Sequence, residues 1–214
     1  MEGSRLCSKK RQRGEASHEE EIGHLTPQIP VELISQKPKV SFILDNAGIK
    51  KAFVRKVLKA ILDSPLNKYG LVGAIYVKIA NGSLFVVKPH VRIPRTLARF
   101  SGLMLELLEK SRIRTSDTHE TLMRVVEEPL IRHLPANSRI IGISTRSPKL
   151  VDVASFVNAT SDETHLVFVF GMSTSGEISQ PHTADVISVT DYPVDATTCI
   201  DLVCGACEEK WNCF

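Results

Sequence analysis

The second half of the chain alternates short, continuous apolar runs with amphipathic segments, and this alternation limits the possible folds more than any other feature. The apolar runs are residues 139–144, 165–171 and 186–189, each with the length of a strand. Residues 150–157 and 194–210 lie between and after them and have the apolar spacing of helices. Strands that are apolar throughout must be covered on both faces. The pattern therefore predicts an α/β domain whose mostly parallel sheet is covered on both faces.

The first half adds a strand and a basic helix. Residues 40–45 (VSFILD) alternate little and predict a buried strand. Residues 50–62 carry an apolar stripe on an otherwise basic segment, which predicts a helix that Pro65 stops.

A hairpin should follow. The apolar runs 71–79 and 83–88 are joined by Asn81-Gly82, a dipeptide typical of tight hairpins in which both turn residues take a positive φ.

Two further helices are expected after the hairpin. One begins near Pro94 and has an apolar side formed by residues such as Leu103 and Leu107. The other covers residues 119–128 (HETLMRVVEE), with a cap at Asp117 or Thr118 and an end at Pro129.

Residues 1–36 are charged, poor in aromatic side chains and broken by prolines, so they are predicted to be a disordered tail. Its basic run 9–13 (KKRQR) fits a nuclear address or a loose nucleic-acid arm, and it fits a solvating tail equally well. No apolar run has the roughly 18 residues of a membrane span, and the first residues have no apolar core typical of a secretory signal.

A glycine-bounded loop, Gly171–Gly176, follows one of the predicted strands with the glycine spacing of a nucleotide phosphate loop. That motif continues with Lys and Ser or Thr, whereas this chain has Glu177 and Ile178, so an NTPase is excluded. Open α/β sheets usually bind ligands at this end of a strand. The loop is therefore either a ligand loop or a simple turn.

Four of the five cysteines gather near the C-terminus, at positions 199, 204, 207 and 213. Zinc sites usually combine two short Cys/His units, and Cys204 and Cys207 have no second unit at a suitable spacing. On a helix both would lie on one apolar face, where cysteine acts as a small hydrophobic residue. No metal site is predicted. The histidines do not cluster either, and they give no support to a hydrolase triad.

Three arginines precede a strongly apolar segment in residues 91–100 (VRIPRTLARF). If Pro94 lies in the first helical turn, Arg95 and Arg99 are one turn apart and Arg92 lies just outside. Cations at a helix N-terminus are disfavoured by about 0.3–1 kcal/mol each. The planar guanidinium group suits phosphate oxygens. We therefore expect a phosphate-binding site here rather than a solvated helix end.

Several motifs resemble one known family. They are DSPLNKYG (63–70), RIPRTLARFSGLM (92–104), HLP (133–135), SVTDYPVDA (188–196) and EEKWN (208–212). The chain resembles the ribosome-biogenesis pseudouridine N1-methyltransferases, which belong to the SPOUT class of S-adenosyl-L-methionine enzymes. The similarity runs in order from about Lys39 to the C-terminus.

The resemblance implies a SPOUT methyltransferase domain over residues 37–214, with a C-terminal trefoil knot and an obligate homodimer. It also implies methylation of N1 of a pseudouridine in small-subunit rRNA, with S-adenosyl-L-methionine as cofactor. Family members act with pre-ribosomal assembly factors in the nucleolus, so a nuclear, nucleolar protein without a metal or a membrane partner is expected.

Site residues follow from the resemblance by position. Those expected to bind the cofactor are Ile143, Gly171, Gly176, Glu177, Val189, Thr190, Asp191, Tyr192, Pro193 and Val194. Those expected to bind RNA are Arg92, Arg95, Arg99 and Lys50, the last at a position where the family has arginine.

The chain departs from the family at the reaction site. The family's aspartate position is Ala52, so the catalytic residue is unknown, and the segment before it is shorter than usual. Glu177 stands where many relatives have lysine, and Asp195 stands where they have serine. Loss of a general base typically costs about 10²–10⁴-fold in rate. Two functions remain open: a methyltransferase, or a catalytically weak or inactive rRNA-binding assembly factor on the same scaffold.

Overall fold

The structure is a computed structural model, and it describes residues 39–47, 51–115, 118–173, 176, 178–180 and 182–213. The predicted tail, residues 1–36, and its basic run lie outside the described residues. No helix among the described residues is long and apolar enough to cross a membrane.

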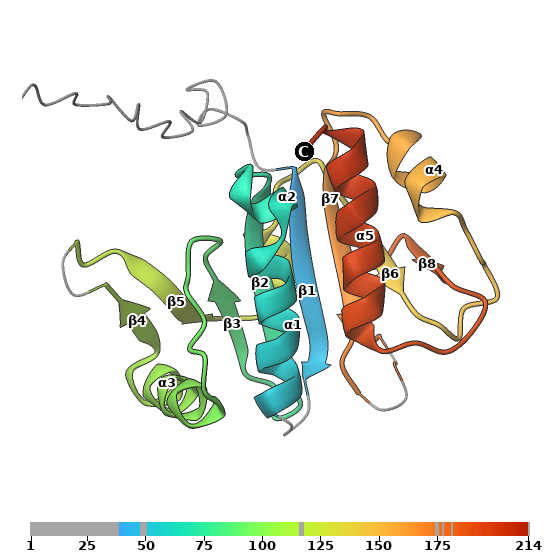
Figure 1. Cartoon of the computed structure of the whole chain (residues 1–214). Coiled ribbons are helices and arrows are strands. Elements are labelled where there is room, and N and C mark those ends of the chain that lie inside the picture. The colour runs from blue at the N-terminus through green and yellow to red at the C-terminus, as the bar shows by residue number, and fades with distance from the viewer. Residues whose placement is uncertain are drawn as a thin grey trace, which may run out of the picture.

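Eight strands form one sheet in the order β4-β5-β3-β2-β1-β7-β6-β8 (Figure 1). Their bounds are β1 Val40–Ala47, β2 Val72–Ile79, β3 Leu84–Val87, β4 Arg112–Arg114, β5 Thr121–Val126, β6 Ser138–Ile143, β7 His165–Gly171 and β8 Asp185–Ile187. Neighbouring strands from β2 to β8 in this order are parallel, and β3, β5 and β4 extend the sheet in antiparallel fashion. The predicted α/β class with a mostly parallel sheet is confirmed. The trefoil knot stays a prediction.

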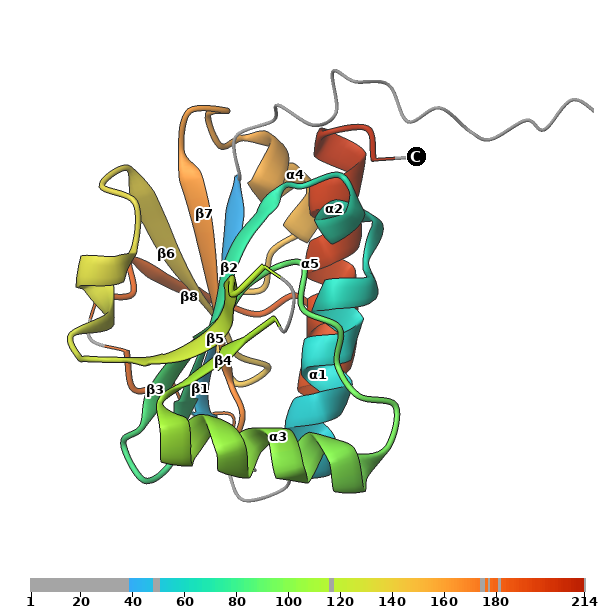
Figure 2. The same cartoon turned by 90° about the vertical axis from the view of Figure 1, so that its left-hand side faces the viewer.

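The α-helices lie on one side of this sheet. They are α1 Lys51–Asp63, α2 Pro65–Lys68, α3 Leu97–Lys110, α4 Val153–Asn158 and α5 Ala196–Lys210. A 3₁₀ helix at Leu130–His133 packs on the other side, where Leu130 joins a separate apolar cluster. Figure 2 shows α1, α2, α4 and α5 over the same face of the sheet, with α3 across its lower end.

The opposite face of the sheet is also covered, as expected, but without an α-helix among the described residues. This face has its own apolar cluster, formed by strand residues such as Ile43, Tyr76 and Val167. Among the described residues, those from outside the strands that pack on this cluster are Leu130, Leu134 and Ile178, which belong to the 3₁₀ helix and to connecting segments. Connecting segments therefore help to bury this face.

The predicted helix at residues 119–128 is also wrong, because Thr121–Val126 forms strand β5. Met123 is buried on the helix side of the sheet, while Arg124 pairs with Val86 on the opposite side. Two adjacent β-branched residues, Val125 and Val126, favour a strand, and pairing with both β3 and β4 outweighs the helical spacing of a short segment.

The hairpin of β2 and β3 is confirmed, but its turn differs from the predicted type. Gly82 has a φ of 90°, and Asn81 is not among the residues with a positive φ. The Gly82 amide donates to the Ile79 carbonyl (2.9 Å), and the Ile79 amide donates to the Ser83 carbonyl (2.8 Å). This is the pattern of a three-residue loop in which a type I turn is followed by a left-handed glycine.

Pro65 ends α1 as predicted and then begins the short helix α2. Ser64 caps α2, since its Oγ accepts a hydrogen bond from the Asn67 amide (3.2 Å). Proline suits the first position of a helix because its missing N–H would have no helical partner there.

Two helices begin later than predicted, because a capping aspartate precedes each of them. Asp152 caps α4, which begins at Val153 rather than at residue 150, and Asp195 caps α5, which begins at Ala196 rather than at residue 194. Each carboxylate accepts a backbone N–H of the first turn that would otherwise lack a partner.

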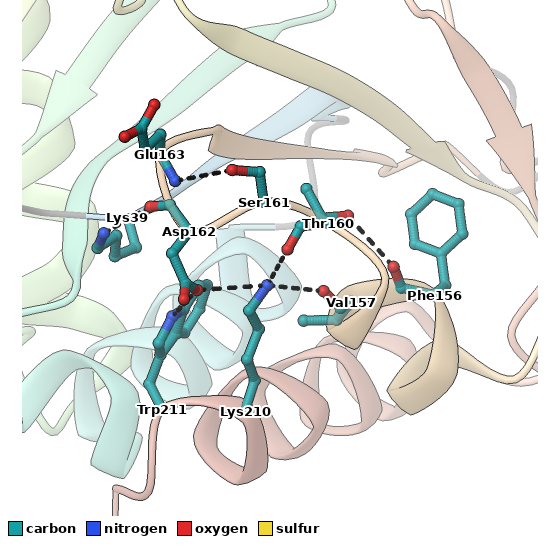
Figure 3. A network of polar contacts seen from close by, with 9 residues as sticks. All are labelled: Lys39, Phe156, Val157, Thr160, Ser161, Asp162, Glu163, Lys210 and Trp211. Carbon is teal, nitrogen blue, oxygen red and sulfur yellow. Dashed lines mark hydrogen bonds and ion pairs between the residues drawn. The ribbon is translucent and has the colours of Figure 1, made fainter.

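A polar network fixes the end of α5 against α4 (Figure 3). The Lys210 side chain is 8% exposed; its Nζ donates to the carbonyls of Val157 (3.0 Å) and Thr160 and lies 3.5 Å from Asp162 Oδ1. Trp211 Nε1 donates to the same Asp162 oxygen (3.2 Å). The hydrogen bond from Trp211 and, to a smaller extent, the charge of Lys210 hold the pKa of the Asp162 carboxyl below its usual range. Lys210 thereby supplies positive charge where α4 ends and its last carbonyls need donors.

We predict that Lys210→Met lowers the free energy of unfolding by about 2–3 kcal/mol, because it keeps the apolar stem but leaves buried carbonyl groups without their charged donor. Urea denaturation measures the change. The matched control is Lys59→Met, which removes the exposed pair with Asp63 and should change stability by no more than about 0.5 kcal/mol. Equal effects of the two variants would contradict the structural role of Lys210.

Candidate functional site

A cavity of about 450 Å³ lies at the carboxyl ends of β6 and β7. Three segments line it: residues 143–146 after β6, residues 170–173 with Gly176 after β7, and residues 193–196 at the start of α5. Phe53 of α1 and Cys199 of α5 complete the lining. Parallel α/β sheets bind their ligands at this edge, because loops from several strands converge there.

The structure brings together half of the residues predicted to bind a cofactor. The residues that line the cavity are Ile143, Gly171, Gly176, Pro193 and Val194. Val189, Thr190, Asp191 and Tyr192 lie outside its lining, and Tyr192 is 62% exposed. Glu177 lies outside the described residues.

The segment 188–192 folds into a turn of its own. Ser188 Oγ donates to the Thr190 carbonyl (2.7 Å), and Thr190 Oγ1 donates to the Tyr192 carbonyl (2.8 Å). This turn sets the position at which Pro193 and Val194 enter the cavity.

Two glycines shape the loop after β7. Gly176 has a φ of 64°, a conformation in which a side chain is strained, and its amide donates to the Ser173 carbonyl (3.0 Å). On β6, a Cβ added to Gly142 would lie 2.8 Å from Ile178 Cδ1. Ile178 therefore packs closely over β6 at Gly142, and a small side chain there would require the end of the Ile178 side chain to shift.

Asp45 is a site residue that sequence reasoning missed. It is fully buried at the end of β1, and its carboxylate accepts hydrogen bonds from Ser179 N (2.5 Å), Ser179 Oγ (2.8 Å) and Gln180 Nε2 (3.0 Å). Its own carbonyl accepts from the amide of Met172, which lines the cavity. A buried carboxylate needs such partners. The signal in the sequence was a charged residue that ends a continuous apolar run.

Asp195 caps α5 beside the cavity. Its Oδ1 accepts from Thr198 N and Thr198 Oγ1 (both 2.8 Å), and its Oδ2 lies 3.1 Å from Lys56 Nζ. The Thr198 amide, then the Thr198 hydroxyl and Lys56 keep the pKa of this carboxyl below its usual value. Serine caps helices about as well as aspartate. Aspartate at this position therefore caps α5 as well as the serine that the resemblance implies would.

The arginine segment does not begin the helix as predicted. Helix α3 begins at Leu97, and its cap is Thr96, whose Oγ1 accepts from the Arg99 amide (3.4 Å). Arg95 therefore lies before the cap and Arg99 in the first turn. Arg92, Arg95 and Arg99 are all exposed, and their guanidinium groups make no hydrogen bond or ion pair with the described residues.

Helix α1 connects this segment to the cavity. Arg55 Nη1 donates to the carbonyls of Arg95 (2.9 Å) and Pro94 (3.4 Å), while Phe53 lines the cavity. Ala52, at the family's aspartate position, is exposed on the first turn of α1 beside Phe53. Lys50, predicted to bind RNA, lies outside the described residues.

The C-terminal cysteines are buried core residues. Cys199, Cys204, Cys207 and Cys213 are all free thiols. Burial raises the pKa of each, to about 11 for Cys199 and Cys213 and further for Cys204 and Cys207. The expectation that Cys204 and Cys207 lie in apolar surroundings is confirmed. Within the described ranges, no three His, Cys, Asp or Glu side chains gather in a group able to hold a metal ion.

Comparison with known proteins identifies one family. Residues 45–208 match the family model described as EMG1/NEP1 methyltransferase. The chain is 35% identical over 173 residues to "Ribosomal RNA small subunit methyltransferase NEP1" of Candida albicans, covering 79% of this chain and 64% of that protein. It is 36% identical over 169 residues to the human protein of the same name, covering 78% of this chain and 67% of that protein. The chain thus spans about two thirds of the length of these relatives.

A solved structure shares the fold. The crystal structure of Archaeoglobus fulgidus Nep1 bound to S-adenosylhomocysteine superposes with a TM-score of 0.62 at 20% sequence identity, covering 75% of this chain and 71% of that chain. The family resemblance and the fold class predicted from the motifs are both confirmed.

We predict that Asp195→Ala lowers the free energy of unfolding by about 1 kcal/mol, because the first turn of α5 loses its cap, whereas Asp195→Ser keeps most of that stability. Chemical denaturation at neutral pH compares the two variants. A loss in Asp195→Ser as large as that in Asp195→Ala would contradict the capping role.

The pH dependence follows from the lowered pKa of Asp195. A carboxyl with a lower pKa in the folded state stabilises the protein fully above its unfolded pKa of about 3.9, and this contribution falls as the pH drops through the folded pKa. The stability difference between wild type and Asp195→Ala should therefore shrink below about pH 4.

Proposed function

Because the chain belongs to the EMG1/NEP1 methyltransferase family, we propose that it methylates N1 of a pseudouridine in small-subunit rRNA with S-adenosyl-L-methionine as the methyl donor. It would thereby act in small ribosomal subunit biogenesis. The observation that carries the proposal is the role of α1, which contributes Phe53 to the cavity and holds the exposed arginine segment through Arg55. A small-molecule cavity and a phosphate-binding surface are thus fixed to the same helix.

The cavity fits the proposed cofactor. Its volume of about 450 Å³ lies within the range typical of small-ligand sites. Ile143, Met172 and Val194 offer apolar contact to a purine ring, while Arg146 and Asp195 offer one charge of each sign to an amino-acid group. These residues would hold S-adenosyl-L-methionine, which supplies an electrophilic methyl group when bound.

The described residues that were predicted to bind the cofactor but lie outside the cavity lining have a different role in this proposal. Val189, Thr190, Asp191 and Tyr192 form the turn that precedes the lining residues Pro193 and Val194. We assign them to shaping the cavity. Gly171 and Gly176 bound the second loop and keep its backbone close to the ligand.

Arg92, Arg95 and Arg99 bind RNA phosphates in this proposal. Their guanidinium groups are exposed and unpaired within the described part of the chain, so no internal ion pair must break before RNA binds. Each can donate two parallel hydrogen bonds to phosphate oxygens. Lys50, the other residue predicted to bind RNA, would meet phosphate as a point charge.

The reaction also requires that the proton on N1 leave as the bond between nitrogen and methyl carbon forms. Ala52 cannot accept it. Among the described residues of the cavity lining, Asp195 has the one carboxylate, and its lowered pKa makes it a weak base at neutral pH. The proton therefore passes to water, and the chain contributes mainly by positioning the base and the donor.

A homodimer, pre-ribosomal assembly factors as partners and a nucleolar location complete the proposal. The support for all three is membership in a family whose members are named as small-subunit rRNA methyltransferases.

The direct test incubates the protein with methyl-labelled S-adenosyl-L-methionine and a stem-loop RNA that contains one pseudouridine. We expect label in that RNA, at N1 by mass spectrometry of the digested nucleosides, and none in the same RNA with uridine. RNA binding without transfer at high protein concentration would instead identify the assembly factor without catalysis. Failure to bind the stem-loop would contradict both functions.

We predict that Arg95→Ala weakens stem-loop binding about tenfold and lowers the slope of log affinity against log salt by roughly 0.7–0.9, because one phosphate contact is lost. The affinity for S-adenosyl-L-methionine, measured by calorimetry, should not change. Lys68→Ala, at an exposed lysine on α2, is the control and should leave RNA binding intact. Equal losses of RNA and cofactor affinity in Arg95→Ala would show that the site is misassigned.

A further inference from the structure

A second cavity, of about 810 Å³, lies on the face of the sheet opposite the helices. It is found at the amino ends of β1, β2 and β7, whereas the first cavity is at the carboxyl ends of β6 and β7. Its polar lining includes Ser41, Tyr76, Lys88, Arg124 and His165. Nothing in the proposed methyl transfer uses this cavity.

Two cations line the cavity on the side of the antiparallel strands, Lys88 at the end of β3 and Arg124 on β5, and a third, Arg112 on β4, lies next to Arg124. Lys88 and Arg124 line the cavity and are exposed. Arg112 is the direct cross-strand partner of Arg124, so the two arginines share a face of the sheet. None of the three side chains makes a hydrogen bond or ion pair with the residues that the structure describes. We call Lys88, Arg112 and Arg124 the far-face cluster.

The pairing of Arg112 with Arg124 destabilises the free protein. Like charges directly opposite each other in an antiparallel pair repel. Nearby carboxylates do not relieve this repulsion, since Glu120 lies against His90 (3.3 Å) and Glu128 against Lys78 (2.6 Å). The cavity lining also contains the Glu163 carboxylate, which has no cationic partner among the described residues. An anionic ligand would relieve the repulsion.

The far-face cluster continues the arginine segment along the chain. Lys88 is four residues before Arg92, so their Cα atoms are at most about 14 Å apart. Residues 88–99 therefore present Lys88, Arg92, Arg95 and Arg99 in succession, with Arg124 beside the first of them. One polyanion can contact both sites.

We propose that the far-face cluster binds the phosphodiester backbone of the single-stranded RNA that flanks the target nucleotide. This inference rests on the proposed function for the identity of the RNA. Arginine forks suit phosphate oxygens, and the polar cavity beside them has the volume to take an unpaired nucleotide. The affinity of the protein for RNA therefore rises when single-stranded RNA flanks the stem-loop.

The test compares two RNAs: the minimal stem-loop, and the same stem-loop with single-stranded flanks of about ten nucleotides, a length within the site sizes of single-strand binding proteins. Wild type should bind the flanked RNA more tightly than the minimal one. Arg124→Glu should lose this gain, with about tenfold weaker binding of the flanked RNA and a salt slope lower by at least about 0.7. Its affinity for the minimal stem-loop should not change.

The stability of Arg124→Glu in urea is a control for its folding. The carboxylate introduced by Arg124→Glu would lie opposite Arg112, and opposite charges at such a pair are favourable. The variant should therefore unfold at the same or a higher urea concentration than wild type.

Lys88→Glu, at the end of the neighbouring strand, should give the same loss of RNA affinity. Lys68→Glu, an equal change of charge on α2 and outside the cavity, should retain the gain.

The proposal is overturned if wild type binds both RNAs equally, if Arg124→Glu and Lys88→Glu keep the gain from the flanks, or if Lys68→Glu loses as much as they do. Failure of the proposed function would look different. Wild type would then fail to methylate or to bind the minimal stem-loop, which the far-face cluster does not contact.

Discussion

The parallel pairing of β1 with β7 is the interaction on which the rest of the structure depends. Six residue pairs, from Val40 with Leu166 to Asp45 with Gly171, join the first strand of the described chain to the strand before the glycine loop. This register places the buried Asp45 carboxylate against the loop after β7, where it holds Ser179 and Gln180. It also places α1, which follows β1, beside α5. The cavity and the arginine segment are therefore assembled by one strand pair.

The charged residues around the cavity show why the scaffold tolerates changes at the family's positions. Asp195, where the resemblance implies a serine, caps α5 through Thr198, and Lys56 offsets its charge. Ala52, where the resemblance implies an aspartate, offers no carboxylate, while its neighbours Phe53 and Arg55 contact the cavity and the arginine segment. Under the proposed function, the cavity and the arginine segment would bind the two substrates, and catalysis would depend on positioning more than on a general base.

Sequence reasoning succeeded where a local pattern determines the structure. Continuous apolar runs gave β1, β6 and β7 within a residue or two. The three arginines around Arg95 are exposed, and their binding of phosphate stays a prediction. Sequence reasoning failed where tertiary contacts decide. Residues 119–128 have helical spacing but pair with two strands, and the second face of the sheet is covered by connecting segments that no periodicity marks. The partners of Asp45 are more than 130 residues away, so no local signal could show them.

Whether the cavity at the carboxyl ends of β6 and β7 binds the methyl donor can be measured by hydrogen–deuterium exchange with and without S-adenosylhomocysteine, the product form of that donor. We expect slower exchange of backbone amides in residues 143–146, 170–173 and 193–196, which line this cavity, and unchanged exchange in residues 133–137 beside the second cavity. Slower exchange confined to the second cavity, or none at all at saturating ligand, would contradict binding of the donor at the first cavity.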